Sequence, residues 1–229
     1  FYTDNGIHSF LYVPRDPSVL AVTFDNLDIA MTKRADRRPR GFEFIEKQVI
    51  GQAIGALDAV ETAAVVVNAS SGIEMITSRM MEWAADRHLC RIVIVNRIDA
   101  ENVDLPGVLA AIRAAFGNEC LPINLPAANG TKVVDCFFNP AGDSDFSSVA
   151  AAHQALIDQV IEVDEDLMAK YLEQGEAIEP EQLHAPFEKA LREGHLIPIL
   201  FVSAKTGAGI KELLHVLAAL APNPLEGNL

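Results

Sequence analysis

The stretch Arg91-Ile-Val-Ile-Val-Asn96 decides the fold of this chain, because a short run of β-branched residues predicts a strand that is buried on both faces. Two further runs have the same character, Thr62-Ala-Ala-Val-Val-Val-Asn68 and Ile197-Pro-Ile-Leu-Phe-Val-Ser203. A segment with helical spacing follows each run, at about residues 73–87, 105–116 and 210–220. Strands that alternate with helices predict an α/β fold, with a parallel sheet and helices on both of its faces.

Polar residues close two of these strands and form a pair of short motifs. Asn96-Arg97-Ile98-Asp99 ends one strand, and Ser203-Ala204-Lys205 ends another. Ligands of parallel α/β sheets bind beyond the carboxyl ends of the strands, which is where both motifs lie. We therefore expect the two motifs to form one binding site.

The chemistry of Asp99 fits a guanine base. A carboxylate accepts hydrogen bonds through two adjacent oxygens, and guanine presents an N1–H and a 2-amino group on one edge. Adenine lacks this pair of donors, so a site that needs both donors rejects it. Asp99 is thus the candidate for reading the base.

The neighbouring residues have supporting roles in this interpretation. Asn96 braces the loop through its amide, and the backbone N–H of Ala204, next to Ser203, donates to the guanine carbonyl oxygen. The stems of Arg97 and Lys205 cover the faces of the ring.

A simpler interpretation of the two motifs stays open at this point. A single four-residue pattern is weak evidence, although two such patterns at strand ends are stronger. In the simpler interpretation Asp99 only caps the following helix, and Ser203 only begins a turn.

The formal net charge of −14 limits the partners of the chain. Residues 1–47 carry seven basic and seven acidic side chains, so the remainder carries 11 basic and 25 acidic ones. An acidic surface repels nucleic-acid phosphates and anionic lipid, so we expect no direct nucleic-acid binding and no membrane binding. The basic residues at 33–40 are the one local exception, and a solvated loop accounts for them.

Cysteine usage indicates a cytoplasmic protein. Cys90, Cys120 and Cys136 lie far apart, which predicts reduced thiols. The sequence shows no signal-peptide pattern and no apolar run of about 18 residues. Histidines and carboxylates lack the spacing of a metal site, so we assign no metal ligand and no catalytic residue.

The chain divides into several predicted parts. Residues 48–123 and 196–224 form the α/β core, and residues 124–195 hold too much predicted structure for a loop. We interpret residues 124–195 as an inserted, helix-rich subdomain. Residues 1–47 form an atypical N-terminal segment, and residues 225–229 begin a linker.

Short elements are predicted within two of these parts. The N-terminal segment has one candidate strand at residues 19–24. The inserted subdomain has a candidate strand and three candidate helices, at residues 133–138, 147–163, 165–173 and 179–193.

Residues 51–224 resemble the rear two-thirds of the GTPase domain of translation elongation factor G and its close paralogues. Val95-Asn-Arg-Ile-Asp99 resembles the V-N-K-x-D base motif, and Ser203-Ala-Lys-Thr-Gly207 resembles the close of the domain. Asp164-Glu-Asp-Leu-Met-Ala-Lys-Tyr-Leu172 resembles a helix of the inserted subdomain typical of this factor. The resemblance implies a fold of the P-loop GTPase superfamily type, GTP or GDP with Mg²⁺ as ligands, and the ribosome as a partner.

The phosphate-binding elements of this family are missing from the 229 residues. No stretch reads G-x-x-x-x-G-K-[ST], and residues 42–50 stand where the family has its D-T-P-G segment. The chain therefore lacks the lysine, the backbone N–H groups and the magnesium-binding hydroxyl that the phosphate loop supplies. Asp104-Leu-Pro-Gly107 has the D-x-x-G form but follows Asp99, so we treat it as coincidental. Arg97 replaces the family's lysine, a mild change because its stem can still stack.

Two functions follow from these observations. In the first, the chain is an elongation factor G-like GTP-binding protein, linked to GTP hydrolysis in ribosomal translation elongation. In the second, it is a catalytically inactive pseudo-GTPase or a protein-interaction module. We expect the isolated chain to be inactive as an enzyme, and we interpret it as a fragment, an aberrant gene product or a divergent paralogue. An open sheet edge, left uncovered by residues 1–47, would promote a dimer.

Overall fold

A parallel sheet lies at the centre of the computed structural model, which describes residues 21–23, 57, 60–164, 167–169, 171 and 180–220. The strand order is β1-β2-β3-β7-β4, and every neighbouring pair is parallel. In this order the strands are β1 Ala21–Thr23, β2 Thr62–Asn68, β3 Cys90–Asn96, β7 Ile197–Val202 and β4 Cys120–Pro122. The predicted α/β fold with a parallel sheet is confirmed.

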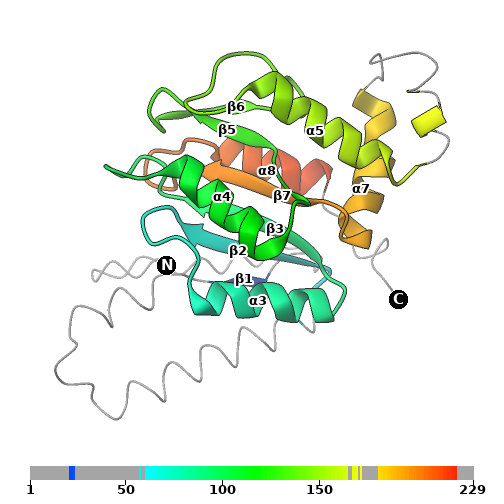
Figure 1. Ribbon diagram of the computed structural model, residues 1–229, viewed down its shortest axis with the longest axis horizontal. Coiled ribbons are helices and arrows are strands. Elements are labelled where there is room, and N and C mark those ends of the chain that lie inside the picture. The colour runs from blue at the N-terminus through cyan, green and yellow to red at the C-terminus, as the bar shows by residue number, and fades with distance from the viewer. Residues whose placement is uncertain are drawn as a thin grey trace, which may run out of the picture.

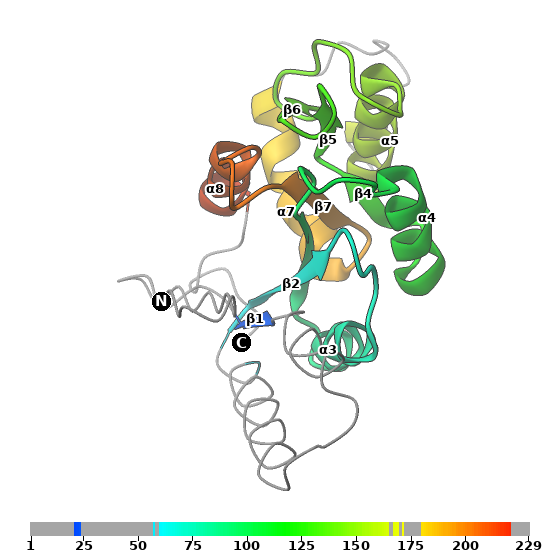
Figure 2. The same cartoon turned by 90° about the vertical axis from the view of Figure 1, so that its left-hand side faces the viewer.

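Helices cover both faces of this sheet (Figure 2). Helices α3 (Met75–Asp86) and α4 (Leu105–Phe116) lie on one face, and α8 (Ile210–Ala219) lies on the other. Each follows a strand directly, and each begins and ends within two residues of its predicted bounds. No helix in the described ranges is long and apolar enough to cross a membrane.

The core strands are apolar because they are covered on both faces. All side chains of β7 are buried, and so are most of those in β2 and β3. Ala64, Val93 and Phe201, one from each strand, have no exposed surface at all. This explains why the three strands are continuous apolar runs in the sequence, without the alternation of a half-exposed strand.

Two short strands were not predicted from the sequence. The three-residue β4 extends the sheet beyond β7, and β5 (Asn124–Ala127) pairs antiparallel with β6 (Lys132–Asp135). Runs of three or four residues that contain proline carry little periodic signal. The strand predicted at residues 133–138 ends early, because the Asp135 carboxylate accepts hydrogen bonds from the backbone N–H groups of the next residues, Phe137, Phe138 and Asn139.

Helix α5 (Val149–Ile161) lies beside the β5–β6 hairpin (Figure 1), and α7 (His184–Glu193) packs against α5 and β3. A 3₁₀ turn, η1 (Pro180–Leu183), opens the segment predicted as a helix at residues 179–193. Helix α5 packs against β4 and α7. Most of the helix predicted at residues 165–173, and residues 1–20 and 24–47, lie outside the described residues. The candidate strand at residues 19–24 coincides with β1.

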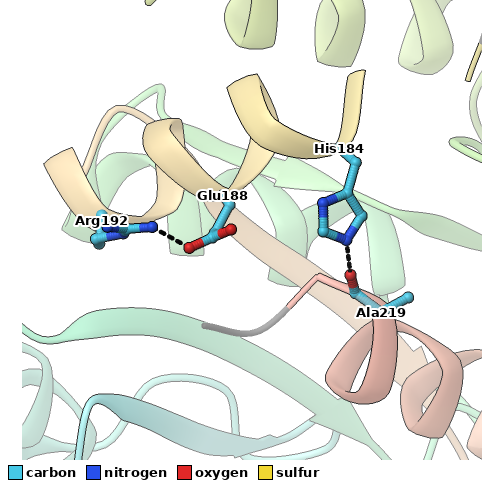
Figure 3. Close-up of polar contacts among 4 residues, drawn as sticks. All are labelled: His184, Glu188, Arg192 and Ala219. Atoms are coloured by element: carbon cyan, nitrogen blue, oxygen red, sulfur yellow. Dashed lines mark hydrogen bonds and ion pairs between the residues drawn. The ribbon is translucent and has the colours of Figure 1, made fainter. Parts of the chain in front are cut away.

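One polar contact connects α7 to the end of α8, and another lies within α7 (Figure 3). His184 Nε2, at the start of α7, donates a hydrogen bond to the Ala219 carbonyl, and Glu188 pairs with Arg192 one turn along α7. The first contact joins residues 35 positions apart in the sequence. It therefore connects the segment that precedes β7 to the helix that follows β7.

Asn124 pairs with the central sheet through its side chain. It is fully buried, its Oδ1 accepts a hydrogen bond from the Phe201 N–H at 2.7 Å, and its Nδ2 donates to the Phe201 carbonyl at 3.1 Å. The amide of Asn124 therefore serves as the backbone partner of β7 at the point where β4 has ended.

We expect Asn124→Ala to destabilise the protein by about 2 to 4 kcal/mol, because it leaves a buried N–H and a buried carbonyl of Phe201 without a partner. Urea unfolding followed by circular dichroism measures the change. The exposed Asn118→Ala is the matched control and should change stability little. Equal effects of the two substitutions would contradict this account of Asn124.

The three cysteines are buried and reduced. Burial raises the pKa of the Cys90 thiol to about 11, and it raises the pKa values of Cys120 and Cys136 to about 12. Since only the thiolate is a good nucleophile, all three are predicted to be inert in the folded protein near neutral pH.

We therefore expect no thiol of the native chain to react with dithionitrobenzoate at pH 8 within minutes, whereas all three react in denaturant. Raising the pH to 9 should not make any thiol reactive, because pH 9 is still below the pKa of each of the three thiols. Rapid release of one equivalent of thionitrobenzoate by the native protein would instead show that one of the three cysteines becomes exposed to solvent.

Candidate functional site

The loops that follow β3 and β7 lie side by side at the carboxyl edge of the sheet, at the left in Figure 1. They are adjacent because β3 pairs with β7, with Asn96 opposite Val202 at the last position of the ladder. This pairing brings together all six residues that the sequence singles out, namely Asn96, Arg97, Asp99, Ser203, Ala204 and Lys205.

Asn96 connects the two loops through one oxygen. Its Oδ1 accepts a hydrogen bond from the Arg97 N–H at 2.8 Å and another from the Ala204 N–H at 3.0 Å. Its backbone carbonyl accepts from the Ala69 N–H at 2.9 Å, which adds the loop after β2. Three strand ends are therefore held together at Asn96.

Arg97 turns the chain sharply after β3. Its φ is +68°, in the left-handed region that costs a non-glycine residue about 1 to 2 kcal/mol. The bond from its N–H to Asn96 and a second bond from the Ala100 N–H to its carbonyl hold this turn. The turn directs the following residues, including Asp99, across the end of β7.

Ser203 binds Asp99 directly. Its Oγ donates to Asp99 Oδ1 at 2.5 Å, and the same oxygen accepts from the Thr206 N–H at 3.1 Å. Ser203 is fully buried, whereas Asp99 is half-buried. Within the described part of the chain no group donates to Asp99 Oδ2. One carboxylate oxygen is thus fixed in place, and the other can accept further hydrogen bonds.

Asp99 is not the cap of the following helix. The N-cap of α4 is Asp104, whose Oδ1 accepts from the Gly107 N–H at 3.0 Å. This cap also gives the D-x-x-G pattern at residues 104–107 a purely structural explanation. Ser203 does begin a turn, since its carbonyl accepts from the Gly207 N–H at 2.8 Å. The simpler interpretation is therefore wrong for Asp99 and incomplete for Ser203.

The Ala204 N–H, which the sequence analysis assigns to the guanine carbonyl oxygen, has a partner within the protein itself. It donates to Asn96 Oδ1, so in this structure it is engaged within the protein. Lys205, the next residue, is exposed, and its backbone N–H makes no hydrogen bond with any described residue. A donor for a ligand is therefore present one residue further along the loop.

Gly209 allows the loop after β7 to return to the sheet before α8 begins. Its φ is +72°, and a Cβ at this position would lie 2.3 Å from the Phe201 carbonyl oxygen. Only glycine fits such a close backbone approach. Packing therefore requires glycine at position 209, whereas a Cβ at Gly207 would meet no atom within 4 Å.

A third segment reaches the site, and no motif in the sequence indicated it. The turn between β5 and β6, residues 128–131, contacts the loop after β3 at Gly130, where a Cβ would lie 2.0 Å from the Ile98 carbonyl oxygen. The dipeptide Asn129-Gly130 is a recognisable turn signal. Its contact with Ile98 depends on tertiary structure and could not have been predicted from that signal.

The described residues do not fit a Mg²⁺ site. In the described ranges no group of three or more His, Cys, Asp or Glu side chains is placed to hold a metal ion. By resemblance, the protein's Mg²⁺ ligand would be a hydroxyl group of the phosphate loop. The 229 residues do not contain this loop. No residue here is assigned to this ion.

Comparison with known proteins identifies the family. Residues 47–223 match the elongation factor Tu GTP binding domain, so the match covers more than half of the chain. The chain belongs to this family of GTP-binding domains. Residues 1–46, most of the segment predicted to be atypical, lie outside the match.

Individual relatives agree with this assignment. The elongation factor G-like protein of Mycobacterium tuberculosis is 30% identical over 190 residues, which cover 77% of this chain and 26% of the relative. The elongation factor G-like protein of Thermotoga maritima is 29% identical over 189 residues, covering 77% and 28%. A crystal structure from Thermus thermophilus has a TM-score of 0.65 and 30% identity, covering 76% of this chain and 28% of that one. The chain thus spans about a quarter of the length of these relatives, and the family resemblance inferred from the sequence is confirmed.

Asn96→Ala should loosen the connection between the two loops. It removes the acceptor for the Arg97 and Ala204 N–H groups, and because the site is partly solvated we expect a loss of about 1 to 2 kcal/mol. Amide hydrogen exchange at Ala204 should accelerate, which heteronuclear NMR measures residue by residue. Asn139→Ala, an exposed asparagine outside this site, is the control. Unchanged protection at Ala204 would show that Asn96 does not hold the loop.

Proposed function

We propose that this chain recognises the guanine base of GTP and GDP through the loops after β3 and β7, as the GTP-binding domain of an elongation factor G-like protein. The observation that carries the proposal is the 2.5 Å hydrogen bond from Ser203 Oγ to Asp99 Oδ1. It fixes the orientation of a carboxylate at the carboxyl edge of a parallel sheet, where ligands of such sheets bind.

Asp99 is the specificity-determining residue in this proposal. Its carboxylate accepts the N1–H and the 2-amino group of guanine together, and Ser203 keeps the carboxylate plane in place before the ligand arrives. Such preorganisation lowers the ordering cost of binding. Bases without the two donors leave the carboxylate unpaired in a partly desolvated site, which disfavours them.

The guanine carbonyl oxygen has a donor in the loop after β7. Because the Ala204 N–H donates to Asn96, we assign this role to the backbone N–H of Lys205. The aliphatic stems of Arg97 and Lys205 are the candidates for covering the two faces of the ring. Asn96 acts indirectly, by keeping the two loops together.

The phosphates have no assigned partner in these 229 residues. Backbone N–H groups at a glycine-rich loop, with a lysine, are the usual way to hold them, and the sequence contains no such loop. We therefore propose that the isolated chain binds the base with modest affinity and does not hydrolyse GTP. Its relation to elongation factor G-like proteins supports a cytoplasmic role in translation elongation, with the ribosome as the partner of the whole protein.

A second candidate function is a pseudo-GTPase or protein-interaction module. The same missing phosphate loop favours it. In this case the α/β core at residues 48–123 and 196–224 and the insertion at residues 124–195 would serve as a scaffold, and the base site would be a remnant.

Parallel calorimetric titrations with GDP and guanosine, with and without Mg²⁺, test the proposal. A base-directed site binds the two ligands with dissociation constants within about tenfold of each other, independently of Mg²⁺, because the phosphates add few contacts. Asp99→Asn should weaken guanosine binding by about tenfold or more, the effect of losing one hydrogen bond to a charged acceptor. The same variant should favour xanthosine, whose 2-carbonyl accepts from the new amide.

Glu101→Gln removes an exposed carboxylate from the same loop and is the matched control, expected to bind like the parent chain. GDP binding that is tighter than guanosine binding by several orders of magnitude and requires Mg²⁺ would instead show a complete phosphate site. Absence of binding by both ligands would reject guanine recognition and leave the scaffold function.

A further inference from the structure

The β5–β6 turn has an unusual backbone. Three successive residues have positive φ: Ala128 at +52°, Asn129 at +57° and Gly130 at +72°. Left-handed conformations are costly for residues with a Cβ, and they persist only where the surrounding structure holds them. Asn and Gly adopt this region readily in tight turns, but Ala128 does not, so contacts outside the turn help to maintain its shape.

Asp145 provides that support. Its Oδ1 accepts from the Asn129 N–H and its Oδ2 accepts from the Gly130 N–H, each at 3.0 Å. The Asp145 backbone N–H donates to the Pro126 carbonyl at 2.8 Å, at the end of β5. Both oxygens of one carboxylate thus hold the turn, and the backbone of the same residue connects it to the hairpin.

The next residue anchors Asp145 to the central sheet. Phe146 packs edge-on against Phe201 of β7, with ring centroids 6.0 Å apart and an interplanar angle of 71°. β7 also carries the loop that contains Ser203. The turn and the base-reading loops are therefore fixed to the same strand.

Gly130 transmits this support to the loop after β3. It is buried, and a Cβ at its position would lie 2.0 Å from the Ile98 carbonyl oxygen and 3.4 Å from the Asp99 nitrogen. On the other side, the Ile98 N–H donates to the Val202 carbonyl at 3.3 Å. The backbone of Ile98 is thus enclosed between β7 and the turn, immediately before Asp99.

We propose that the β5–β6 turn, held in its left-handed form by Asp145, positions the backbone of Asp99 and thereby sets the discrimination of guanine from bases that lack its 2-amino group. Gly130 and Asp145 are positioning residues, since neither is argued to touch the ligand. The inference rests on the proposed function, because it assigns Asp99 the role of reading the base.

The geometry gives this support a clear physical effect. Ser203 holds the Asp99 carboxylate and Gly130 supports its backbone, so both ends of the residue are fixed. A methyl group at position 130 needs more than about 1 Å of extra room to reach an ordinary contact distance, and hydrogen bonds weaken steeply over such displacements. Two donors on one base edge can be matched only while both carboxylate oxygens stay in place.

Two variants and two matched controls test the inference. Gly130→Ala introduces the crowding, and Gly142→Ala is its control, because Gly142 also has a positive φ of +117° but its added Cβ meets only Val134 side-chain atoms at 3.6 and 3.7 Å. Asp145→Asn removes one of the two acceptors that hold the turn. Asp143→Asn, an exposed neighbour two residues away, is its control.

Two readouts are measured on the full 229-residue chain. The first is the ratio of guanosine to inosine affinity by NMR titration, since inosine differs only by lacking the 2-amino group. We expect a preference of about tenfold or more in the parent chain, reduced to less than about threefold in Gly130→Ala and Asp145→Asn and retained in both controls. The second is hydrogen exchange of the Ile98 and Ala100 amides without ligand, which donate to Val202 and Arg97 and should exchange faster in the two test variants alone.

The outcomes separate the inference from the proposed function. If the parent chain prefers guanosine and the folded test variants keep the full preference, the turn does not position Asp99, while guanine recognition stands. If the parent chain shows no preference, guanine recognition fails and this inference fails with it. Should Gly130→Ala not fold, Asp145→Asn decides the question, because it introduces no crowding at Ile98.

Discussion

The parallel pairing of β3 with β7 is the constraint on which the rest of this structure depends. It brings Asp99 into hydrogen-bond contact with Ser203, a residue 104 positions further along the chain. The pairing exists because both strands are apolar enough to be buried on both faces, and the site exists because both strands change to polar residues at the same edge. Burial of the strands and placement of the site thus follow from one arrangement of residues. The identity and spacing of the closing residues then determine what chemistry this edge can offer.

Much of the fold was predictable from local sequence. β2, β3 and β7 are long enough for their apolar character to be read, and α4 extends over the predicted residues 105–116 because Asp104 caps it and Gly117 follows it. β4 and β5 were missed because runs of three or four residues that contain proline carry little periodic signal, and β4 in addition pairs only with the distant β7. In the site, the sequence indicated which residues meet, but it did not indicate that Ala204 donates to Asn96 or that Gly130 supports Ile98. Both contacts arise from segments brought together only by folding.

In the proposed function, base reading and phosphate binding are two tasks with different physical needs. Reading a base needs a few well-oriented acceptors and donors, which two loop ends can provide. Holding phosphates needs several N–H groups and a cation that face a dense negative charge, and this requires a dedicated loop at a helix N-terminus. The chain provides the first set in an ordered form, in which Asn96, Asp99 and Ser203 are each held by hydrogen bonds. If the proposed base-reading role of Asp99 holds, selectivity for the base and affinity for the phosphates depend on separate parts of the domain.

Asn124 has a consequence for how this domain can change in evolution. Its side-chain amide pairs with the backbone N–H and carbonyl of Phe201 in β7. The hydrogen bonding of β7 on this side is therefore complete before the following segment begins. The entropy cost of closing a longer loop rises only slowly with its length. Residues can therefore be gained or lost in the exposed loops between Asn124 and Ile197, outside the buried parts of β5, α5 and α7, without shifting the register of β7, provided that the asparagine stays. A single amide thus helps to keep the alignment of the strands that carry the site independent of the length of these exposed loops.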